Sequence, residues 1–249
     1  MHWVHKQQIA GQSTSPYSDE PKYYVYVSNT KVDMLFAQIP RSMIKAIAVD
    51  FKIDLKVLSL SLKGNPPQET LYSKTRVVSR YIRENFEVTT LEPTTEDDGK
   101  FLPDIAEPAT FFQGCGPMTW GIYGDIPKEN PEKVALFLGK ELEEMIALIG
   151  SPHHILGQAE MRNAGSRMSS FGVFPVDFAS AAFRLNAREE AIKGSSAVDT
   201  LAHYHRQIGG PHQVLEFLAR KLEYGRSIDD GGGNVTVLLG SPIYVAMVG

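Results

Sequence analysis

The chain has 249 residues, of which 43% are hydrophobic and 22% are charged, and its formal net charge is −4. This composition is typical of a folded globular protein and excludes wholesale disorder, while a slightly acidic chain offers no general electrostatic attraction to nucleic acid or an anionic membrane. The single cysteine, Cys115, excludes an intrachain disulfide and any metal site built on paired cysteines.

The start of the chain predicts a polar arm and a cytoplasmic protein. Residues 1–21 are rich in Ser, Pro and Gln, which favours a flexible segment, and they contain no apolar stretch of a signal peptide. No apolar run approaches the roughly 18 residues that a membrane helix needs, and a lone cysteine is typical of a reducing compartment. No Pro/Ser-rich linker divides the rest, so residues 22–249 are expected to form a single domain.

The first elements after the arm are short. The aromatic and β-branched run at 23–27 predicts a strand, which ends at a cluster of turn residues. Asp33 is placed to cap a short helix over 34–38, and a second helix is expected over 41–49 because Pro40 ends the first.

The next elements are longer and more regular. Residues 51–62 alternate as a strand with one change of phase, which a β-bulge would produce. Apolar residues near a 3.6-residue spacing predict a helix over 68–86. A strand is expected at 88–91, followed by an acidic surface loop at 94–100.

The middle of the chain is harder to assign. Residues 103–131 contain many Pro and Gly residues and predict a long irregular segment with strand pieces at 110–113 and 118–123. Residues 133–149 fit either a helix or two strands, and we favour the hairpin because both runs are apolar on both faces and Gly139 interrupts the helix. A further strand is expected over 154–161.

The last third predicts helices followed by a central strand. Apolar spacing indicates helices over 177–192, 198–208 and 211–224. Residues 229–233 are interpreted as a flexible linker, and the apolar, β-branched run from 235 to 248 predicts a strand at the centre of a sheet. The fold class predicted is therefore α+β, with a mixed or mainly antiparallel central sheet flanked by about four to five helices.

A Gly-Ser-Pro sequence follows an apolar strand twice, at 150–152 and at 240–242. Glycine permits close approach of another group, and serine offers a hydroxyl. Proline has no backbone N–H to donate to a neighbouring strand. Two such strand ends side by side, with Ser151 and Ser241, would make a polar notch for a ligand. The alternative, which we favour at this point, is that both are bends in the sheet.

The adjacent histidines His153 and His154 follow the first of these sequences. Neighbours on a strand point to opposite faces, so the pair would not chelate one metal, and no metal site or cofactor is predicted. Their spacing is not that of a known hydrolase motif. His153 and His154 with Ser151 remain weak candidates for catalysis, and a structural role is favoured.

The turn after the first strand contains Ser28, Lys31 and Asp33. A helix that starts after a strand is a natural anion site, and Lys31 adds positive charge, although no glycine-rich phosphate loop is present. Cys115, between two glycines, has no evident partner base and is interpreted as apolar filler. The candidate ligand-binding residues are Ser28, Lys31, Asp33, Trp120, Ser151, His154, Ser241 and Tyr244.

Several segments together resemble an uncharacterised bacterial family that is catalogued as a domain of unknown function. They are Tyr23–Ser28, Lys31–Leu35, Gln38–Pro40, Lys52–Lys56, Met118–Gly121, Ser151–Gly157 and Leu239–Ala246. The resemblance covers nearly the whole chain after residue 22 and implies one domain in a bacterial cytosolic setting. It implies no activity, substrate or catalytic residue.

Three functions remain open on this sequence. The first choice is a module that binds or senses a small molecule, anionic or nucleotide-like, in a bacterial regulatory or defence pathway. The second is a protein-interaction or structural subunit without catalysis, for which a protein partner or a homo-oligomer is expected. The third is a hydrolase that uses His153 or His154 with Ser151. Binding of nucleic acid or membrane is not expected.

Overall fold

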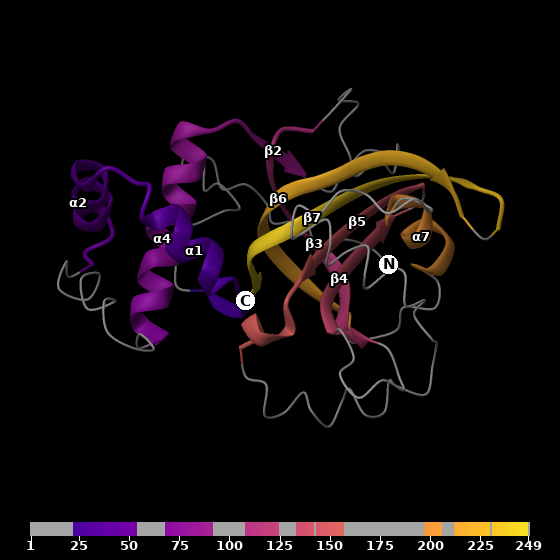
Figure 1. The fold of residues 1–249 in the computed structure, drawn as a ribbon, viewed down its shortest axis with the longest axis horizontal. Coiled ribbons are helices and arrows are strands. Elements are labelled where there is room, and N and C mark those ends of the chain that lie inside the picture. Colours follow the sequence, from indigo (N-terminus) through magenta and orange to yellow (C-terminus); the bar gives the residue numbers. More distant parts are fainter. Residues whose placement is uncertain are drawn as a thin grey trace, which may run out of the picture.

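The fold is seen in a computed structural model, which describes residues 22–53, 68–91, 108–124, 133–141, 143–156, 197–205, 212–229 and 231–248. These residues form an α+β structure with a mainly antiparallel sheet and α-helices on its outside (Figure 1). The elements in chain order are β1 (Tyr23–Val27), α1 (Asn29–Phe36), α2 (Arg41–Asp50), α4 (Gln68–Asn85), β2 (Val88–Leu91), β3 (Phe111–Gly124), β4 (Lys133–Glu141), β5 (Glu144–Gly150), a 3-10 turn (Pro152–His154), α7 (Ala197–Tyr204), β6 (His212–Ile228) and β7 (Asn234–Met247).

Five of the strands pair in a closed ring. β3 pairs with β4, β4 with β5, β5 with β7, β7 with β6, and β6 returns to β3. β1 adds to β7 and β2 adds to β3, and among the described strands the β2–β3 and β5–β7 pairs are parallel while the others are antiparallel. The ring closes because β3, β6 and β7 are long enough to pair with different partners along their length.

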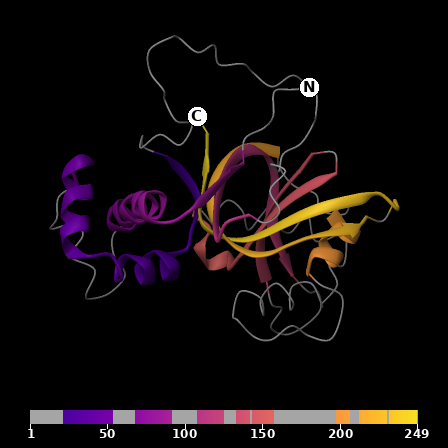
Figure 2. The same ribbon diagram turned by 90° about the horizontal axis from the view of Figure 1, so that it is seen from above.

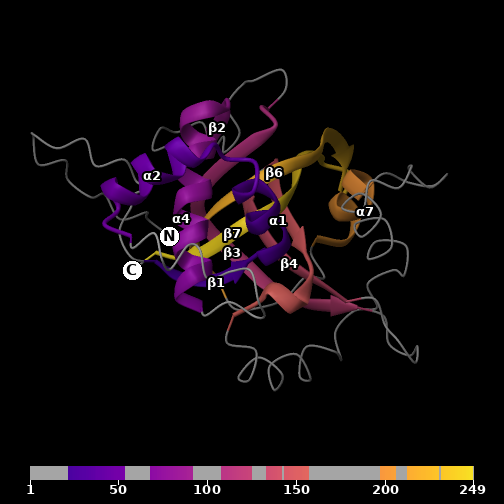
Figure 3. The same ribbon diagram turned by 60° about the vertical axis from the view of Figure 1, so that its left-hand side comes forward.

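The buried side chains form three clusters, which follow from this closed pairing. One cluster contains strand residues and Ile155 but no helix residue, among them Phe112, Phe137 and Phe217, and it fills the inside of the ring. A second lies under α7, and a third lies under α1, α2 and α4. Figures 2 and 3 show the group α1, α2 and α4 at one side of the sheet, and α7 lies well away from these three helices.

Several predicted elements are confirmed. The strands at 23–27 and 88–91, the helices at 41–49 and 68–86 and the hairpin at 133–149 are present with small changes of boundary. The helix predicted over 198–208 is α7, which is described over Ala197–Tyr204. The strand predicted from 235 to 248 is β7, and it continues through Pro242 without a break.

The helix predicted over 211–224 is wrong, because residues 212–224 belong to the strand β6. The prediction relied on the apolar residues Val214, Leu218 and Leu222. Their spacing of four fits one face of a helix, but four is also a multiple of two, the repeat of a strand. Residues 215–219 are all buried, since the inner core covers one face and the helical layer covers the other.

The described residues of the linker predicted at 229–233, which are Asp229 and Gly231–Gly233, form a tight turn between β6 and β7. The Asp229 carboxylate accepts hydrogen bonds from the backbone N–H of Gly231 at 3.0 Å and of Gly233 at 2.8 Å. Gly232 adopts a φ of 81°, which favours glycine. This turn explains how two such long strands pair along their whole length.

The strand pieces predicted at 110–113 and 118–123 are joined in one continuous strand, β3, and residues 103–107 and 125–131 of the predicted irregular segment lie outside the described residues. Pro117 is tolerated within β3 because it lies between the residues that pair with β2 and those that pair with β4. Among the described residues, one edge of β3 therefore has no partner strand at Pro117, and a strand proline is acceptable at such a position.

Smaller predictions also change. The first helix begins at Asn29 rather than after Asp33, which lies in its second turn. Phe51–Ile53 form a turn with Lys52 at a φ of 55°, and the rest of the predicted strand at 51–62 lies outside the described residues. Pro152–His154 form a 3-10 turn where a strand was expected to begin. The helix predicted at 177–192, the loop at 94–100 and the arm at 1–21 also lie outside the described residues.

Candidate functional site

The sheet has a gap in its hydrogen-bond ladder where β1 and β5 both end against β7. β5 pairs with β7 as far as Gly240, and β1 pairs with β7 from Tyr244 onward. Between them, the backbone of Ile243 accepts a hydrogen bond from the Ser28 N–H at 2.9 Å. On this edge of β7, Ser241 and Pro242 therefore face the ends of two strands, while the opposite edge pairs with β6.

Lys31 fills this gap from α1. Its ammonium donates to the Pro242 carbonyl oxygen at 3.1 Å and to the Ser241 hydroxyl. The Ser241 hydroxyl in turn donates to the Ile149 carbonyl oxygen at 3.3 Å. Lys31 reaches this place because α1 starts directly after β1, with Ser28 as its N-cap residue, and because the buried Val32 holds this turn of the helix against the core.

The charge of Lys31 has no acidic partner in the described part of the chain. Its side chain is half-buried, and burial, followed by the nearby charge of Arg220, lowers the pKa of Lys31 to about 8. Arg220 lies opposite Ser241 in the register of β6 and β7 and is exposed. Its guanidinium makes no hydrogen bond or ion pair with any residue that the structure describes, so two cations lie near each other without a counter-charge.

His154 and Tyr26 complete the surroundings of the gap. Their rings meet edge to face with centroids 5.8 Å apart. Burial lowers the pKa of His154, and the charges of Lys31 and His153 lower it further, so its imidazole is neutral at pH 7. Tyr26 is fully buried, and burial raises the pKa of its hydroxyl.

The Tyr26 hydroxyl makes no hydrogen bond of normal geometry in the described structure. The Ser28 side chain and the Ser151 backbone lie near enough to offset part of the rise in its pKa. The hydroxyl fits only because residue 150 is glycine, since a Cβ atom at Gly150 would lie 2.2 Å from the Tyr26 oxygen.

We call this group of side chains the strand-end site. It comprises Tyr26, Ser28, Lys31, Ser151, His154, Arg220 and Ser241. The two Gly-Ser-Pro sequences therefore meet, although the interpretation as two separate bends was favoured from the sequence. Tyr26 and Arg220 were missed by sequence reasoning, because Tyr26 was assigned only to a strand and Arg220 lay in a segment assigned to a helix.

Three of the predicted ligand-binding residues lie elsewhere. Asp33 accepts from Lys74 of α4 at 2.6 Å. Trp120 stacks on Phe137 in the inner core, with ring centroids 5.7 Å apart, and donates its indole N–H to Gln213 at 2.9 Å. Tyr244 belongs to a separate network of buried charges.

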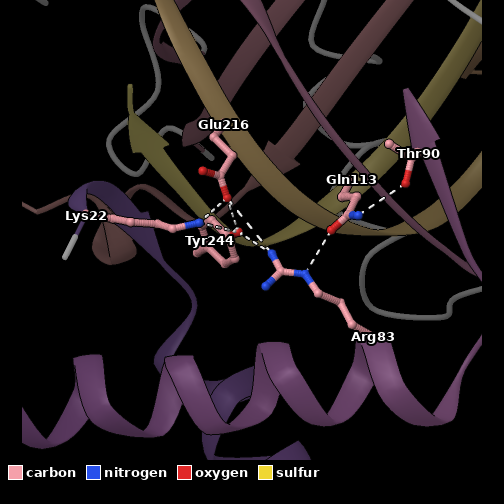
Figure 4. A network of polar contacts seen from close by, with 6 residues as sticks. All are labelled: Lys22, Arg83, Thr90, Gln113, Glu216 and Tyr244. Atoms are coloured by element: carbon pink, nitrogen blue, oxygen red, sulfur yellow. Dashed lines mark hydrogen bonds and ion pairs between the residues drawn. The ribbon is translucent and has the colours of Figure 1, made fainter. Parts of the chain in front are cut away.

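This second network connects α4 to the sheet (Figure 4). Glu216 of β6 accepts from the Tyr244 hydroxyl at 2.5 Å and from Lys22, and Arg83 of α4 donates to the Tyr244 oxygen at 3.0 Å. The chain of contacts continues from Arg83 to Gln113 at 2.9 Å and from Gln113 to Thr90 at 3.1 Å. Burial, followed by the Glu216 charge, raises the pKa of Tyr244 well above its ordinary value.

A charged residue within an apolar run is the feature of the sequence that indicates this network. Glu216 is the only charged residue in the apolar run Val214–Ala219, and a carboxylate inside such a run requires partners once both faces are buried. Because these residues were assigned to a helix with Val214, Leu218 and Leu222 inward, Glu216 received no role. The network crosses four strands and one helix, which makes it a candidate for holding the helical layer in place.

Cys115 lies opposite Glu216 in the register of β3 and β6. Burial, followed by the Glu216 charge, raises the pKa of its thiol to about 11. The thiol is therefore protonated at neutral pH, which does not favour a nucleophile.

The Ser151 hydroxyl accepts from the backbone N–H of His153 at 3.4 Å and so caps the 3-10 turn. Among the described residues, neither His153 nor His154 makes a ring hydrogen bond to Ser151. His205 is bonded to the Ala202 carbonyl at 2.8 Å and to Lys140, and His212 is bonded to Thr119 at 3.0 Å. A Ser–His pair with the geometry of general-base catalysis is thus absent from this part of the structure.

A search of the described residues finds no group of three or more His, Cys, Asp or Glu side chains that could hold a metal ion. In the same residues, no helix combines the length and apolar character needed to cross a membrane.

Comparison with protein families gives one match. A family model described as a family of unknown function, DUF7019, matches residues 22–249. The chain belongs to this family. The DUF7019 match begins at Lys22, so it includes every residue of the strand-end site and excludes residues 1–21. Neither a curated protein nor a solved structure matches the chain.

Proposed function

We propose that this DUF7019 protein binds a small anionic molecule at the strand-end site and acts as a binding or sensing module. The observation that carries the proposal is the pair of cations, Lys31 and Arg220, which have no acidic partner among the described residues.

The physical reason is the cost of an uncompensated charge. A half-buried ammonium loses part of its hydration, and proteins normally compensate this loss with a carboxylate or with a bound ion. Lys31 has only a hydroxyl and a carbonyl, both neutral, and Arg220 adds a second positive charge beside it. A bound anion supplies the missing negative charge and relieves the repulsion between the two cations.

The test of this proposal is binding to a panel of anions by isothermal titration calorimetry. The panel contains acetate, bicarbonate, inorganic phosphate, sulfate and nucleotides, and the variant is Lys31→Met. We expect at least one anion to bind to the natural chain and the variant to bind it about tenfold more weakly or worse, the loss typical of a charged hydrogen bond. Lys45→Met is the matched control, because Lys45 is exposed on α2.

Arg220→Gln separates binding from folding. Lys31 bonds to β7, so its loss can also lower stability, whereas the exposed Arg220 has no side-chain partner in the described residues. We therefore expect Arg220→Gln to weaken anion binding about threefold to tenfold and to leave the unfolding temperature unchanged. Absence of binding by every anion in the panel would refute the proposal.

The role in a bacterial regulatory or defence pathway and the organisation of residues 22–249 as a single domain are part of this proposal. The sequence resemblance supports the bacterial setting and the single domain, and it carries no information about the pathway. The interaction and hydrolase alternatives have no specific contact in the described residues that favours them over ligand binding.

A further inference from the structure

The charge and the unused donors of the strand-end site define the kind of anion that fits it. Lys31 and Arg220 contribute two positive charges, and His154 is neutral at pH 7. The carboxylate nearest in sequence on the same helix, that of Asp33, is engaged by Lys74 of α4 at 2.6 Å. The described residues at the site therefore leave two positive charges to be matched.

The donors can be counted in the same way. An ammonium has three N–H donors, and Lys31 uses two of them on Ser241 and Pro242, so one remains. A guanidinium presents two parallel N–H groups along one edge, and those of Arg220 are unused in the described structure. The site thus offers three donors and two positive charges, supplied by two side chains on neighbouring elements.

We propose that the ligand is a dianion of the phosphate-monoester class, bound between Lys31 and the guanidinium of Arg220. This inference rests on the proposed function and specifies the ligand of the same site. A phosphate monoester carries a charge of about −1.5 to −2 at pH 7 and three strong acceptor oxygens. It matches both the charge and the number of donors, whereas a carboxylate or a sulfate ester supplies one negative charge.

The pH dependence of binding follows from the groups that surround Lys31. Arg220 of β6 and His154 of the 3-10 turn are the titratable or charged groups near it, and the His154 ring in turn contacts Tyr26 of β1. The pKa of Lys31 is about 8 in the free protein, so the side chain loses its proton above that pH. A bound dianion favours the ammonium and raises this pKa again, so binding near pH 8 takes up protons from solution.

Protonation of the ligand sets the acidic limit of the pH range in which binding is strong. A phosphate monoester gains a proton below a pH of about 6 and becomes a monoanion. Affinity is therefore greatest between about pH 6 and pH 8. It falls at lower pH because the ligand gains a proton, and it falls at higher pH because Lys31 loses one.

The decisive experiment compares methyl phosphate with methyl sulfate, which share a shape but carry two charges and one charge respectively. Titration calorimetry on the full chain at pH 7.5 is expected to give at least about tenfold tighter binding of methyl phosphate. At pH 8, the binding heat is expected to depend on the ionisation enthalpy of the buffer, which shows proton uptake. In Lys31→Arg, whose side chain stays charged, the alkaline fall in affinity is expected to disappear.

The outcomes separate this inference from the proposed function. If methyl sulfate or acetate binds as tightly as methyl phosphate, and Lys31→Met abolishes that binding, the site binds anions but the dianion inference is wrong. If methyl phosphate binds equally well to Lys31→Met and to the natural chain, the site is elsewhere and both are wrong. Equal binding heats in all buffers at pH 8 also overturn the role of Lys31, even where Lys31→Arg fails to fold.

Discussion

A single glycine decides how the strand-end site is built. Gly150 ends β5 at the point where the Tyr26 ring passes over it, and a Cβ atom there would lie 2.2 Å from the hydroxyl oxygen and 2.7 Å from the ring carbon that carries it. The close approach brings an aromatic side chain of β1 against the end of β5 and places His154 at its edge. At this scale the site depends on the absence of a side chain.

We expect Gly150→Ala to lower the free energy of unfolding by about 1–3 kcal/mol, because an added methyl group in a packed interior displaces its neighbours. Urea denaturation measures the change. Gly225→Ala is the control, since a Cβ atom at Gly225 meets Val198 at an ordinary 3.7 Å. Tyr26→Phe in the Gly150→Ala background removes the nearest atom and is expected to restore part of the loss. Equal effects of the two alanine substitutions would contradict this account.

Among the elements, α4 is joined to the sheet by charges as well as by apolar packing. Arg83 donates hydrogen bonds to Tyr244 and Gln113. One carboxylate oxygen of Glu216 accepts hydrogen bonds from both Tyr244 and Lys22 (Figure 4). A buried network of this kind contributes little net stability compared with an apolar core, but it costs much when one partner is removed. It therefore fixes the position of the helix more than it adds to stability.

Glu216→Gln is expected to destabilise the protein by about 2–3 kcal/mol, because the change leaves Lys22 and Arg83 near a neutral group in a largely buried place. The same chemical change at Glu84, which forms an exposed pair with Arg80 on α4, is expected to cost no more than about 0.5 kcal/mol. Thermal and urea unfolding of the two variants provide the measurement. Similar losses in both would show that the network is not a constraint on α4.

At the scale of the whole molecule, the closed ring of β3, β4, β5, β7 and β6 leaves few free strand edges in the described structure. β7 pairs with three strands, whereas β1 and β2 are short additions at the outside. A ring cannot lose one strand without exposing the inner core, which contains Phe112, Phe137 and Phe217. Its strands should therefore unfold together.

Hydrogen exchange measured by mass spectrometry tests this expectation. Peptides from β3, β5, β6 and β7 are expected to share one high protection level, close to the global free energy of unfolding, because their amides open only when the ring opens. Peptides from β2 serve as the internal comparison and should exchange earlier. If β6 exchanges well before β7, the ring does not behave as one cooperative unit.

Much of the secondary structure is determined by the sequence itself. The strands β1, β2 and β7 and the helices α2 and α4 follow from local composition and apolar spacing. The β4–β5 hairpin fitted a helix as well, and Gly139 between two apolar runs favoured the strands. Lys31, Ser241 and the two Gly-Ser-Pro sequences could be selected in the same way, since glycine, proline and an unpaired lysine beside turn residues are conspicuous.

Only the tertiary structure decided how these parts meet. Residues 212–228 are a strand because their backbone pairs with β3 and β7, whereas an apolar spacing of four fits a helix and a strand equally. The same pairing puts Arg220 opposite Ser241 and Glu216 beneath α4. The meeting of Lys31 with Ser241 joins residues 210 positions apart, and strand register, which local sequence does not specify, brings them together.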